Sequence, residues 1–289
     1  MNIAIPPDVA AAASLRDGDE LVLEVRPDGL HVGTDSLRKV YVELTGRCNL
    51  TCAMCPRPAW AASTADMSPS CFHALLEGLP PGRSDCVTLV FSGFGEPTLH
   101  PAFLFLVARA RAAGRRVELI TNGTTMTPEL ADDLVTLDLG QVTVSLDGGD
   151  HDAYLDMRGR ALGPVVDGLT ALCEVRRRHK ARTAIGVACV LTRRTAASIP
   201  ALVDLARRLS LDFVSISNVV PHTADMAAEA LWTHAGQLSN AHPSSWRPRL
   251  IAGRFDGNES TRPLLEVLLR QVPMVPPPAM DSGAWQNRC

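Results

Sequence analysis

Three of the eight cysteines of this 289-residue chain lie within one short segment. Cys48, Cys52 and Cys55 are spaced four and three residues apart, so their thiolates are able to converge on one metal centre. A structural zinc site takes four closed ligands, and the next cysteine, Cys71, falls inside a predicted helix. An iron–sulfur cube held by three thiolates leaves one iron open to a ligand. The spacing therefore favours an iron–sulfur centre over the alternative of three unrelated buried thiols.

Two further polar segments follow predicted strands. The sequence Phe-Ser-Gly-Phe-Gly-Glu-Pro at 91–97 contains Gly93 and Gly95, which permit a close backbone approach, and Glu96, whose carboxylate can accept hydrogen bonds from an ammonium group. The sequence Thr-Asn-Gly at 121–123 places Asn122 in a turn. Each segment is also typical of an ordinary turn, so the segments indicate binding only in combination with the cysteines.

A fourth segment, Ser-Leu-Asp-Gly at 145–148, ends another predicted strand. Ser145 and Asp147 supply oxygens suited to ribose hydroxyl groups, and Arg158 suits a carboxylate partner. A solvated arginine at a helix end is the alternative for Arg158. His222 lies near the mouth expected for a substrate, although a lone histidine is more often structural. No residue identifies itself as a catalytic acid, base or nucleophile.

Six short apolar segments alternate with helical segments over the middle of the chain. Runs rich in Val, Ile and Leu are typical of strands buried on both faces. The strands are predicted at 40–44, 87–91, 117–120, 141–145, 183–191 and 213–217. The helices are predicted at 68–79, 102–113, 128–137, 163–179 and 196–209. This α/β order predicts a partial (βα)6 TIM-type barrel with its functional groups at the carboxyl ends of the strands.

The two ends of the chain differ from this pattern. Alternating apolar residues around the Pro-Asp-Gly turn at 27–29 predict a small N-terminal β-hairpin module over 1–36. The barrel is expected over 37–240, followed by an irregular, proline-rich C-terminal extension over 241–289 with one helical segment at 262–269. Of the other cysteines, four are expected to be core thiols, namely Cys71, Cys86, Cys173 and Cys189.

Composition excludes several classes of protein. The chain has 28 Lys and Arg against 31 Asp and Glu, a balance that gives no electrostatic reason to expect binding to nucleic acid or to an anionic membrane. Its apolar stretches are shorter than the roughly 18–20 residues that cross a bilayer, and its start lacks the basic residues of a signal peptide. A cytoplasmic location is expected, where thiols remain reduced.

The motifs together resemble the radical S-adenosylmethionine (SAM) superfamily. The segment Glu-Leu-Thr-Gly-Arg-Cys-Asn-Leu-Thr-Cys at 43–52 is similar to its cysteine motif, and 91–97 is similar to its glycine-glutamate motif. The resemblance implies that the three cysteines bind a [4Fe–4S] cluster, whose open iron chelates SAM and whose electron cleaves it to a 5′-deoxyadenosyl radical. It also implies that Gly93, Gly95 and Glu96 hold the SAM amino group. Phe94 departs from the motif, where a glycine is usual.

The same resemblance assigns the remaining candidates. Met54 stands where the family usually has an aromatic residue beside the adenine. Asn122 borders the cofactor pocket, Ser145 lies near the ribose or carboxylate of SAM, and Asp147 and Arg158 are further candidates for binding it. A low-potential electron donor of the flavodoxin or ferredoxin type is the expected partner protein.

Within the superfamily, the chain resembles maturases with SPASM or twitch extensions, in particular those associated with tungsten-cofactor oxidoreductases. A client protein or a cofactor precursor is then the expected substrate. The Asn-Arg-Cys segment at 287–289 resembles the start of a SPASM region, which implies an auxiliary iron–sulfur cluster in a longer form of the chain. Two alternatives stay open: a peptide-modifying maturase, and a non-catalytic iron–sulfur scaffold or adaptor. The N-terminal module resembles AbrB-type hairpins and is expected to dock or dimerise.

Overall fold

The computed structural model describes residues 5–12, 21–26, 29–34, 39–58, 63–79, 87–220 and 222–230. The predicted C-terminal extension, its helix, and the cysteines Cys86 and Cys289 lie outside these ranges. None of the helices within them is long and apolar enough to cross a membrane.

Six parallel strands form one sheet, and they follow one another in chain order. The strands are β3 (Lys39–Val42), β4 (Thr88–Phe91), β5 (Arg116–Thr121), β6 (Gln141–Ser145), β7 (Ala184–Leu191) and β8 (Phe213–Asn218). β3 and β8 are the two outermost strands of this sheet, so the sheet is not closed. The predicted partial barrel is therefore confirmed, with every predicted strand found within a few residues of its expected bounds.

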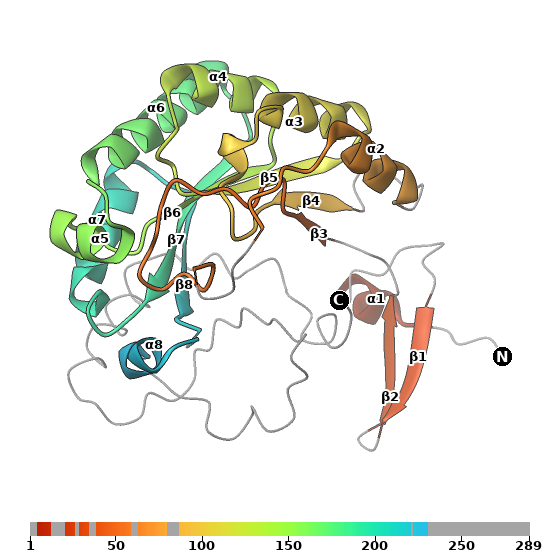
Figure 1. Ribbon diagram of the computed structural model, residues 1–289. Helices are drawn as coiled ribbons and strands as arrows, with labels where there is room; N and C mark the ends of the chain where they lie inside the picture. Colours follow the sequence, from red (N-terminus) through yellow and green to blue (C-terminus); the bar gives the residue numbers. More distant parts are fainter. Residues whose placement is uncertain are drawn as a thin grey trace.

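Helices connect the strands and lie over the outer face of the curved sheet (Figure 1). They are α2 (Pro69–Gly78), α3 (Phe103–Ala112), α4 (Pro128–Thr136), α5 (His151–Arg158), α6 (Gly163–His179) and α7 (Ile199–Arg208). A further helix, α8 (Ala224–Glu229), follows β8, and two short 3₁₀ turns, η1 (Pro97–Leu99) and η2 (Ala196–Ser198), precede α3 and α7. The sequence did not predict α5 or α8. The helix expected at 196–209 divides into η2 and α7, because Pro200 lacks an N–H and lies in the first turn of α7.

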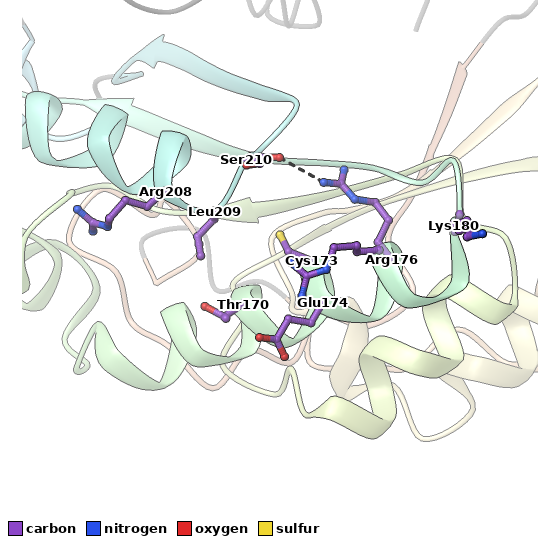
Figure 2. A pocket seen from close by; sticks show the side chains of 10 residues that line it. Thr170, Cys173, Glu174, Arg176, Lys180, Arg208, Leu209 and Ser210 are labelled. Atoms are coloured by element: carbon purple, nitrogen blue, oxygen red, sulfur yellow. Dashed lines mark hydrogen bonds between the residues drawn. The ribbon is translucent and has the colours of Figure 1, made fainter.

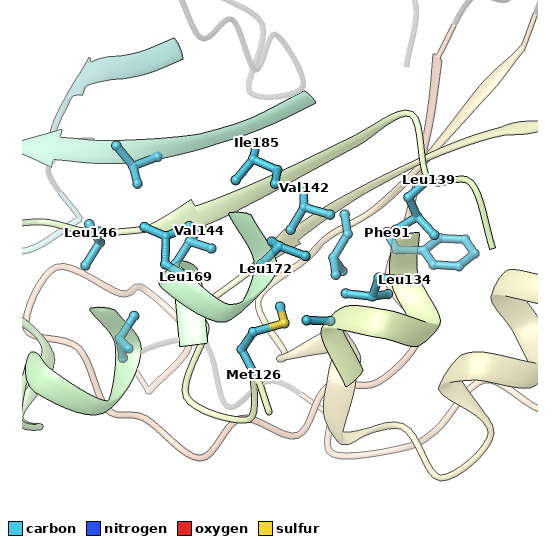
Figure 3. Close-up of a cluster of buried hydrophobic side chains, with 14 of the residues drawn as sticks. Phe91, Met126, Leu134, Leu139, Val142, Val144, Leu146, Leu169, Leu172 and Ile185 are labelled. Carbon is cyan, nitrogen blue, oxygen red and sulfur yellow. The ribbon is translucent and has the colours of Figure 1, made fainter. Parts of the chain in front are cut away.

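The core lies between the sheet and these helices. Val142, Val144 and Ile185 of the strands pack against Leu169 and Leu172 of α6, all fully or almost fully buried (Figure 3). Burial of this apolar surface fixes the register of the strands beneath the helices. The loops at the carboxyl ends of the strands are thereby presented from a rigid platform.

The N-terminal hairpin is also present. After α1 (Pro7–Ala12), β1 (Leu21–Arg26) pairs in antiparallel fashion with β2 (Gly29–Thr34), and Arg26 faces Gly29 across the turn. The division of the chain into three domains and the likeness of this hairpin to AbrB-type modules stay predictions.

The scattered cysteines only partly follow expectation. Cys189 of β7 is buried in the core, and Cys173 of α6 is half-buried against it. The prediction for Cys71 was wrong, because this thiol is exposed on α2. The apolar stripe of α2 is formed by Phe72 and Leu76 with their neighbours, and Cys71 falls outside it.

Candidate active site

The cysteine-rich loop follows β3 and is held by the last turn of α5. The N–H of Ala53 donates to the carbonyl of Met157 at 2.9 Å, and the N–H of Cys55 donates to the carbonyl of Cys52 at 3.0 Å. Cys52 is buried, whereas Cys48 and Cys55 are half-buried. The three thiols thus lie on one loop at the carboxyl end of the first strand of the sheet, as the sequence predicted.

Asn122 connects this loop to the turn after β5. Its Nδ2 atom donates to Cys48 Sγ at 3.9 Å and to Asn49 Oδ1 at 2.9 Å. Its Oδ1 atom accepts from the N–H of Thr124 at 2.9 Å, and Asn49 Nδ2 donates to Thr124 Oγ1 at 2.8 Å. Asn122 is buried, so these contacts fix its amide beside the Cys48 sulfur.

Cys52 has a charged neighbour. Arg158 Nη1 donates to Cys52 Sγ at 3.6 Å. Burial raises the pKa of the Cys52 thiol, and the nearby Arg158 guanidinium acts in the opposite direction. The Asp147 carboxylate and the other two thiols add to the increase in the Cys52 pKa. The three sulfurs therefore lie within one another's electrostatic field.

The thiols are not arranged around a single ion. Within the described ranges, no three His, Cys, Asp or Glu side chains are grouped as metal-ion ligands. In a four-iron cube each thiolate binds a different iron, so the sulfurs stand further apart than around one ion. Within the described residues, the loop is therefore not preformed for a lone zinc ion.

The Glu96 carboxylate accepts four hydrogen bonds. Its Oε1 atom accepts from Thr98 Oγ1 at 2.7 Å, from the Thr98 N–H at 3.2 Å and from Thr121 Oγ1 at 2.7 Å. Its Oε2 atom accepts from the N–H of Asn122 at 2.6 Å. Glu96 is only 2% exposed, so its carboxylate joins the turn after β4 to the end of β5.

Two glycines let the turn after β4 lie against the cysteine loop. A Cβ atom on Gly95 would fall 1.8 Å from the Thr45 carbonyl oxygen, and one on Gly93 would fall 2.6 Å from the Glu43 carboxylate. Glu43 Oε1 accepts from the N–H groups of Phe94 and Gly95 at 2.6 and 3.0 Å. The sequence motif contained Glu43 but had given it no role; its place directly after β3 was the available signal.

Asp66 fastens the start of the cysteine loop from the other side, which sequence analysis missed. Thr45 Oγ1 donates to Asp66 Oδ1 at 2.6 Å, and Arg47 Nη2 donates to Asp66 Oδ2 at 2.8 Å. These two partners, the Thr45 hydroxyl first, lower the pKa of Asp66. Arg47 Nη2 also donates to the carbonyl of Leu99, the last residue of η1, at 3.0 Å, so the loop is bound to η1.

The Ser-Leu-Asp-Gly segment brings Asp147 and Arg158 together. Asp147 is fully buried, and its Oδ2 atom lies 2.5 Å from Arg158 Nε in an ion pair. Its Oδ1 atom accepts from the N–H of Val190 at 2.7 Å, which attaches it to β7. Ser145, at the end of β6, is half-buried. Arg158 is not the solvated arginine of the alternative interpretation.

Met54 packs against an apolar cluster. This cluster consists of Val219, Met226 and Ala230, with Met54 and Val190 partly buried against it. It lies beside the ends of β7 and β8 and is formed in part by α8. The side chain of Met54 therefore contributes to an apolar surface next to the cysteines.

Gly186 of β7 and the candidate His222 both have structural explanations. An ideal Cβ on Gly186 would lie 2.5 Å from the ring of Phe213, so packing accounts for this glycine. His222 is half-buried, and its Nδ1 atom lies 3.4 Å from the carbonyl of Val220, a contact within its own loop.

A cavity of about 560 Å³ lies elsewhere, between the ends of α6 and α7 (Figure 2). It is lined by Cys173, Arg176, Lys180, Arg208 and their neighbours, and Arg176 donates to the carbonyl of Ser210 at 3.2 Å. α6 and α7 end close to the starts of β7 and β8. The cavity is therefore at the amino ends of the strands, whereas the cysteine loop is at their carboxyl ends. None of the predicted site residues lines it.

The comparison with known families decides the broad assignment. Residues 42–217, more than half of the chain, match the sequence model of the radical SAM superfamily. The chain belongs to this superfamily. Its members are enzymes for which a [4Fe–4S] cluster and SAM are implied, in agreement with the predicted cofactors.

Curated radical SAM relatives share part of their length with the chain. It is 28% identical over 200 residues to the tungsten-containing aldehyde ferredoxin oxidoreductase cofactor-modifying protein of Pyrococcus furiosus, covering 68% of this chain and 55% of the relative. It is 32% identical over 166 residues to the mycofactocin maturase MftC of Mycobacterium tuberculosis, covering 57% of this chain and 41% of the relative. The chain thus spans about half the length of these relatives or less.

Solved radical SAM structures share the fold. Streptococcus suis SuiB bound to S-adenosylmethionine aligns with a TM-score of 0.54 and 16% identity, over 66% of this chain and 43% of that one. The protein anSMEcpe with bound AdoMet aligns with a TM-score of 0.50 and 20% identity, over 64% and 52%. At these identities the likeness supports the open six-stranded barrel alone.

Proposed function

We propose that the protein is a radical SAM maturase that reductively cleaves SAM to modify a cofactor of another enzyme, of the tungsten- or molybdenum-pterin type. The observation that carries the SAM chemistry is the arrangement of the Cys48, Cys52 and Cys55 loop against the Glu96 and Asn122 turns. Four chain segments far apart in sequence are bonded to one another at this end of the sheet. This arrangement supports adjoining sites for a cluster and a nucleotide.

The donor set fits the cluster. Three soft sulfur ligands on one loop suit iron–sulfur chemistry. Asn122 and Arg158 each direct an N–H toward a sulfur, at 3.9 and 3.6 Å, and such donors stabilise cluster thiolates. When bound, the cluster supplies the electron that cleaves SAM to the 5′-deoxyadenosyl radical. The chain's own part is to hold the thiolates, to fix the orientation of SAM and to keep water out.

The proposed SAM contacts are those that the family resemblance implies, and the positions of the side chains support them. Gly93, Gly95 and Glu96 are assigned to the amino group, with Glu96 acting mainly through the turn that its four hydrogen bonds stabilise. Ser145, at the end of β6, is assigned to the ribose or carboxylate of SAM. Met54 is assigned to the adenine, because its apolar cluster offers the flat ring a nonpolar surface.

The substrate class is suggested by the relatives. The Pyrococcus furiosus relative is a cofactor-modifying protein of a tungsten enzyme, and its similarity extends over 68% of this chain. On this proposal a low-potential flavodoxin or ferredoxin delivers the electron, and the N-terminal hairpin docks the client. An auxiliary cluster, suggested by Cys289, belongs to the same proposal for a longer form of the chain only.

Anaerobic reconstitution tests the SAM chemistry. The chain should bind about four iron and four sulfide per protein. With dithionite and SAM it should then release 5′-deoxyadenosine. A chain that is fully loaded with iron and sulfide but forms no 5′-deoxyadenosine is a non-catalytic scaffold, and the proposal is wrong.

The substrate class needs its own test, because a relative named mycofactocin maturase favours a peptide as second candidate. The loaded chain is incubated with SAM and either the extracted pterin cofactor of a tungsten enzyme or a precursor peptide. The rate of 5′-deoxyadenosine formation should rise with the pterin cofactor and not with the peptide. The reverse result makes the protein a peptide-modifying maturase.

A further inference from the structure

A charged pair is sealed directly beneath the cysteine loop. The side chains of Arg158 and Asp147 are 10% and 0% exposed, and their ion-pair distance is 2.5 Å. The Arg158 guanidinium also contacts Cys52 Sγ at 3.6 Å, so one cation contacts both a carboxylate and a sulfur. The pair therefore combines a buried positive group at the sulfur with a buried negative group held by Val190 of β7.

Holding α5 in place does not require this charge. Helix α5 is capped at its start by Asp150, whose side chain accepts from the Ala153 N–H at 2.9 Å, and at its end by Gly159 in a left-handed conformation. The backbone bond from Ala53 to Met157 joins the helix to the cysteine loop. A buried ion pair is in general no more stabilising than apolar residues of the same volume. Structure alone therefore leaves the charges without an explanation.

The contact with Cys52 supplies one. The reduction potential of an iron–sulfur cluster depends on the charges nearby and on the hydrogen bonds to its sulfurs. One-electron reduction makes the cluster more negative, so a guanidinium at a ligating sulfur stabilises the reduced form and raises the potential. A carboxylate behind the guanidinium has the opposite effect and offsets part of that increase.

We infer that the Asp147–Arg158 pair sets the reduction potential of the cluster held by Cys48, Cys52 and Cys55. Arg158 acts on the cluster through Cys52, and Asp147 acts by orienting Arg158 and by partly compensating its charge. The inference rests on the proposed function, since it requires a cluster at these cysteines. Both residues are then positioning residues for the cluster rather than direct ligands of SAM.

The test is an anaerobic redox titration of the reconstituted full chain without SAM, in which the EPR signal of the reduced cluster is measured at each potential. Arg158→Gln should shift the midpoint potential to more negative values, and Asp147→Asn should shift it to more positive values. The double variant should fall between them. Arg176→Gln, which breaks an arginine–aspartate pair at the opposite edge of the sheet, should leave the midpoint unchanged.

Opposite shifts of the midpoint potential support the inference, because a merely structural role would not make the sign of the shift depend on the sign of the charge that is removed. Equal midpoints, or shifts in the same direction, overturn it. An Arg158→Gln chain with an unchanged midpoint but lost SAM affinity also overturns it and assigns Arg158 to SAM. Should Arg158→Gln not fold, Arg158→Lys retains the charge and should keep a midpoint near that of the wild type; a large negative shift there counts against the inference. A wild-type chain that assembles no cluster refutes the proposed function itself.

Discussion

The carboxyl ends of the parallel strands form one side of the sheet, called here the carboxyl edge, and their amino ends form the amino edge. Two arginine–aspartate pairs attach helices to these two edges. Arg158 and Asp147 are sealed at the carboxyl edge, whereas Arg176 pairs at the amino edge with Asp212, whose side chain is 45% exposed. Arg176 also donates to the backbone carbonyls of Thr183 and Ser210, which lie close to the starts of β7 and β8. At the amino edge an arginine–aspartate pair thus attaches a helix, whereas at the carboxyl edge the arginine of such a pair also contacts a sulfur.

The cysteines at the two edges repeat this contrast. Burial raises the pKa of both Cys52 and Cys173, and a nearby arginine acts against the increase in each case. What distinguishes Cys52 is the company of Cys48 and Cys55 on one loop. A buried thiol beside an arginine is therefore no indication of function without the further thiols.

The largest difference between the edges is expected on removing the thiols. Cys52→Ala should abolish the visible absorbance of the reconstituted cluster and all 5′-deoxyadenosine formation, because two thiolates do not hold the cube. Cys173→Ala should leave both at the wild-type level. Absorbance and product formation are measured on chains reconstituted in parallel; a loaded and active Cys52→Ala chain would falsify the assignment of the loop.

The two ion pairs should differ in their contribution to stability. Arg158→Met leaves the Asp147 carboxylate buried without a partner, which is expected to cost about 3–5 kcal/mol of unfolding free energy. Arg176→Met removes a partly exposed pair and should cost about 1 kcal/mol. Urea unfolding of the metal-free chains measures both values. Equal costs would show that burial does not distinguish the two edges.

Two carboxylates associated with β5 allow the same comparison for SAM. Glu96 accepts from Thr121 and Asn122 at the carboxyl end of the strand, whereas Glu118 pairs with Lys39 near its start. Glu96→Gln weakens hydrogen bonds to a charged acceptor worth about 1.5–3 kcal/mol, so SAM should bind about tenfold or more weakly. Glu118→Gln should leave the affinity unchanged. Calorimetric titration of the reconstituted chains decides between them.

Asp66, which fastens the cysteine loop, should contribute to the loss of stability in acid. The pKa of Asp66 is lowered from 3.8 chiefly by the Thr45 hydroxyl, so its folded pKa lies below its unfolded value. The carboxylate therefore stabilises the fold above pH 3.8, and this contribution is lost as the pH falls through the lower folded value. Asp66→Asn should reduce the loss of stability below pH 3.8 in urea unfolding series.

Asp132 is the matched control for that experiment. Its pKa is lowered by His179 and then by Arg178, both of α6, away from the cysteines. Asp132→Asn should reduce the acid dependence in the same way but leave SAM affinity intact. Asp66→Asn should also weaken SAM binding, since Asp66 fastens Thr45 and Arg47 of the loop. Unchanged SAM affinity in both variants would assign Asp66 to stability alone.

The sheet and the strand-end motifs were predictable because their signals are local. Buried parallel strands are continuous apolar runs, and β6 was predicted to the residue. The sulfur, glycine and turn residues are likewise adjacent in sequence to the strand that presents them. Because each motif directly follows its strand in the sequence, sequence alone was sufficient to predict which residues lie at the carboxyl edge.

The connections between the motifs were not predictable. Helix α5 is mostly polar and buries only Tyr154, Met157 and Arg158, so it lacks a long apolar stripe. The contact between Arg158 and Cys52 joins residues 106 positions apart. The Asp66 contacts and the Glu43 hydrogen bonds depend on the close approach of loops, which residue types alone do not report.

The smallest effect is expected at Tyr154, which lies in the same buried region as the ion pair. Its hydroxyl makes no hydrogen bond within the described part of the chain, and burial raises its pKa to about 12. Tyr154→Phe removes a polar group that has no partner to lose, so the unfolding free energy should change by less than about 1 kcal/mol. The cluster midpoint should also stay at the wild-type value, because the neutral phenol carries no charge at neutral pH. A midpoint shift as large as that of Arg158→Gln would mean that the hydroxyl, and not the guanidinium alone, acts on Cys52, and the contrast between the two edges would then rest on three side chains instead of two.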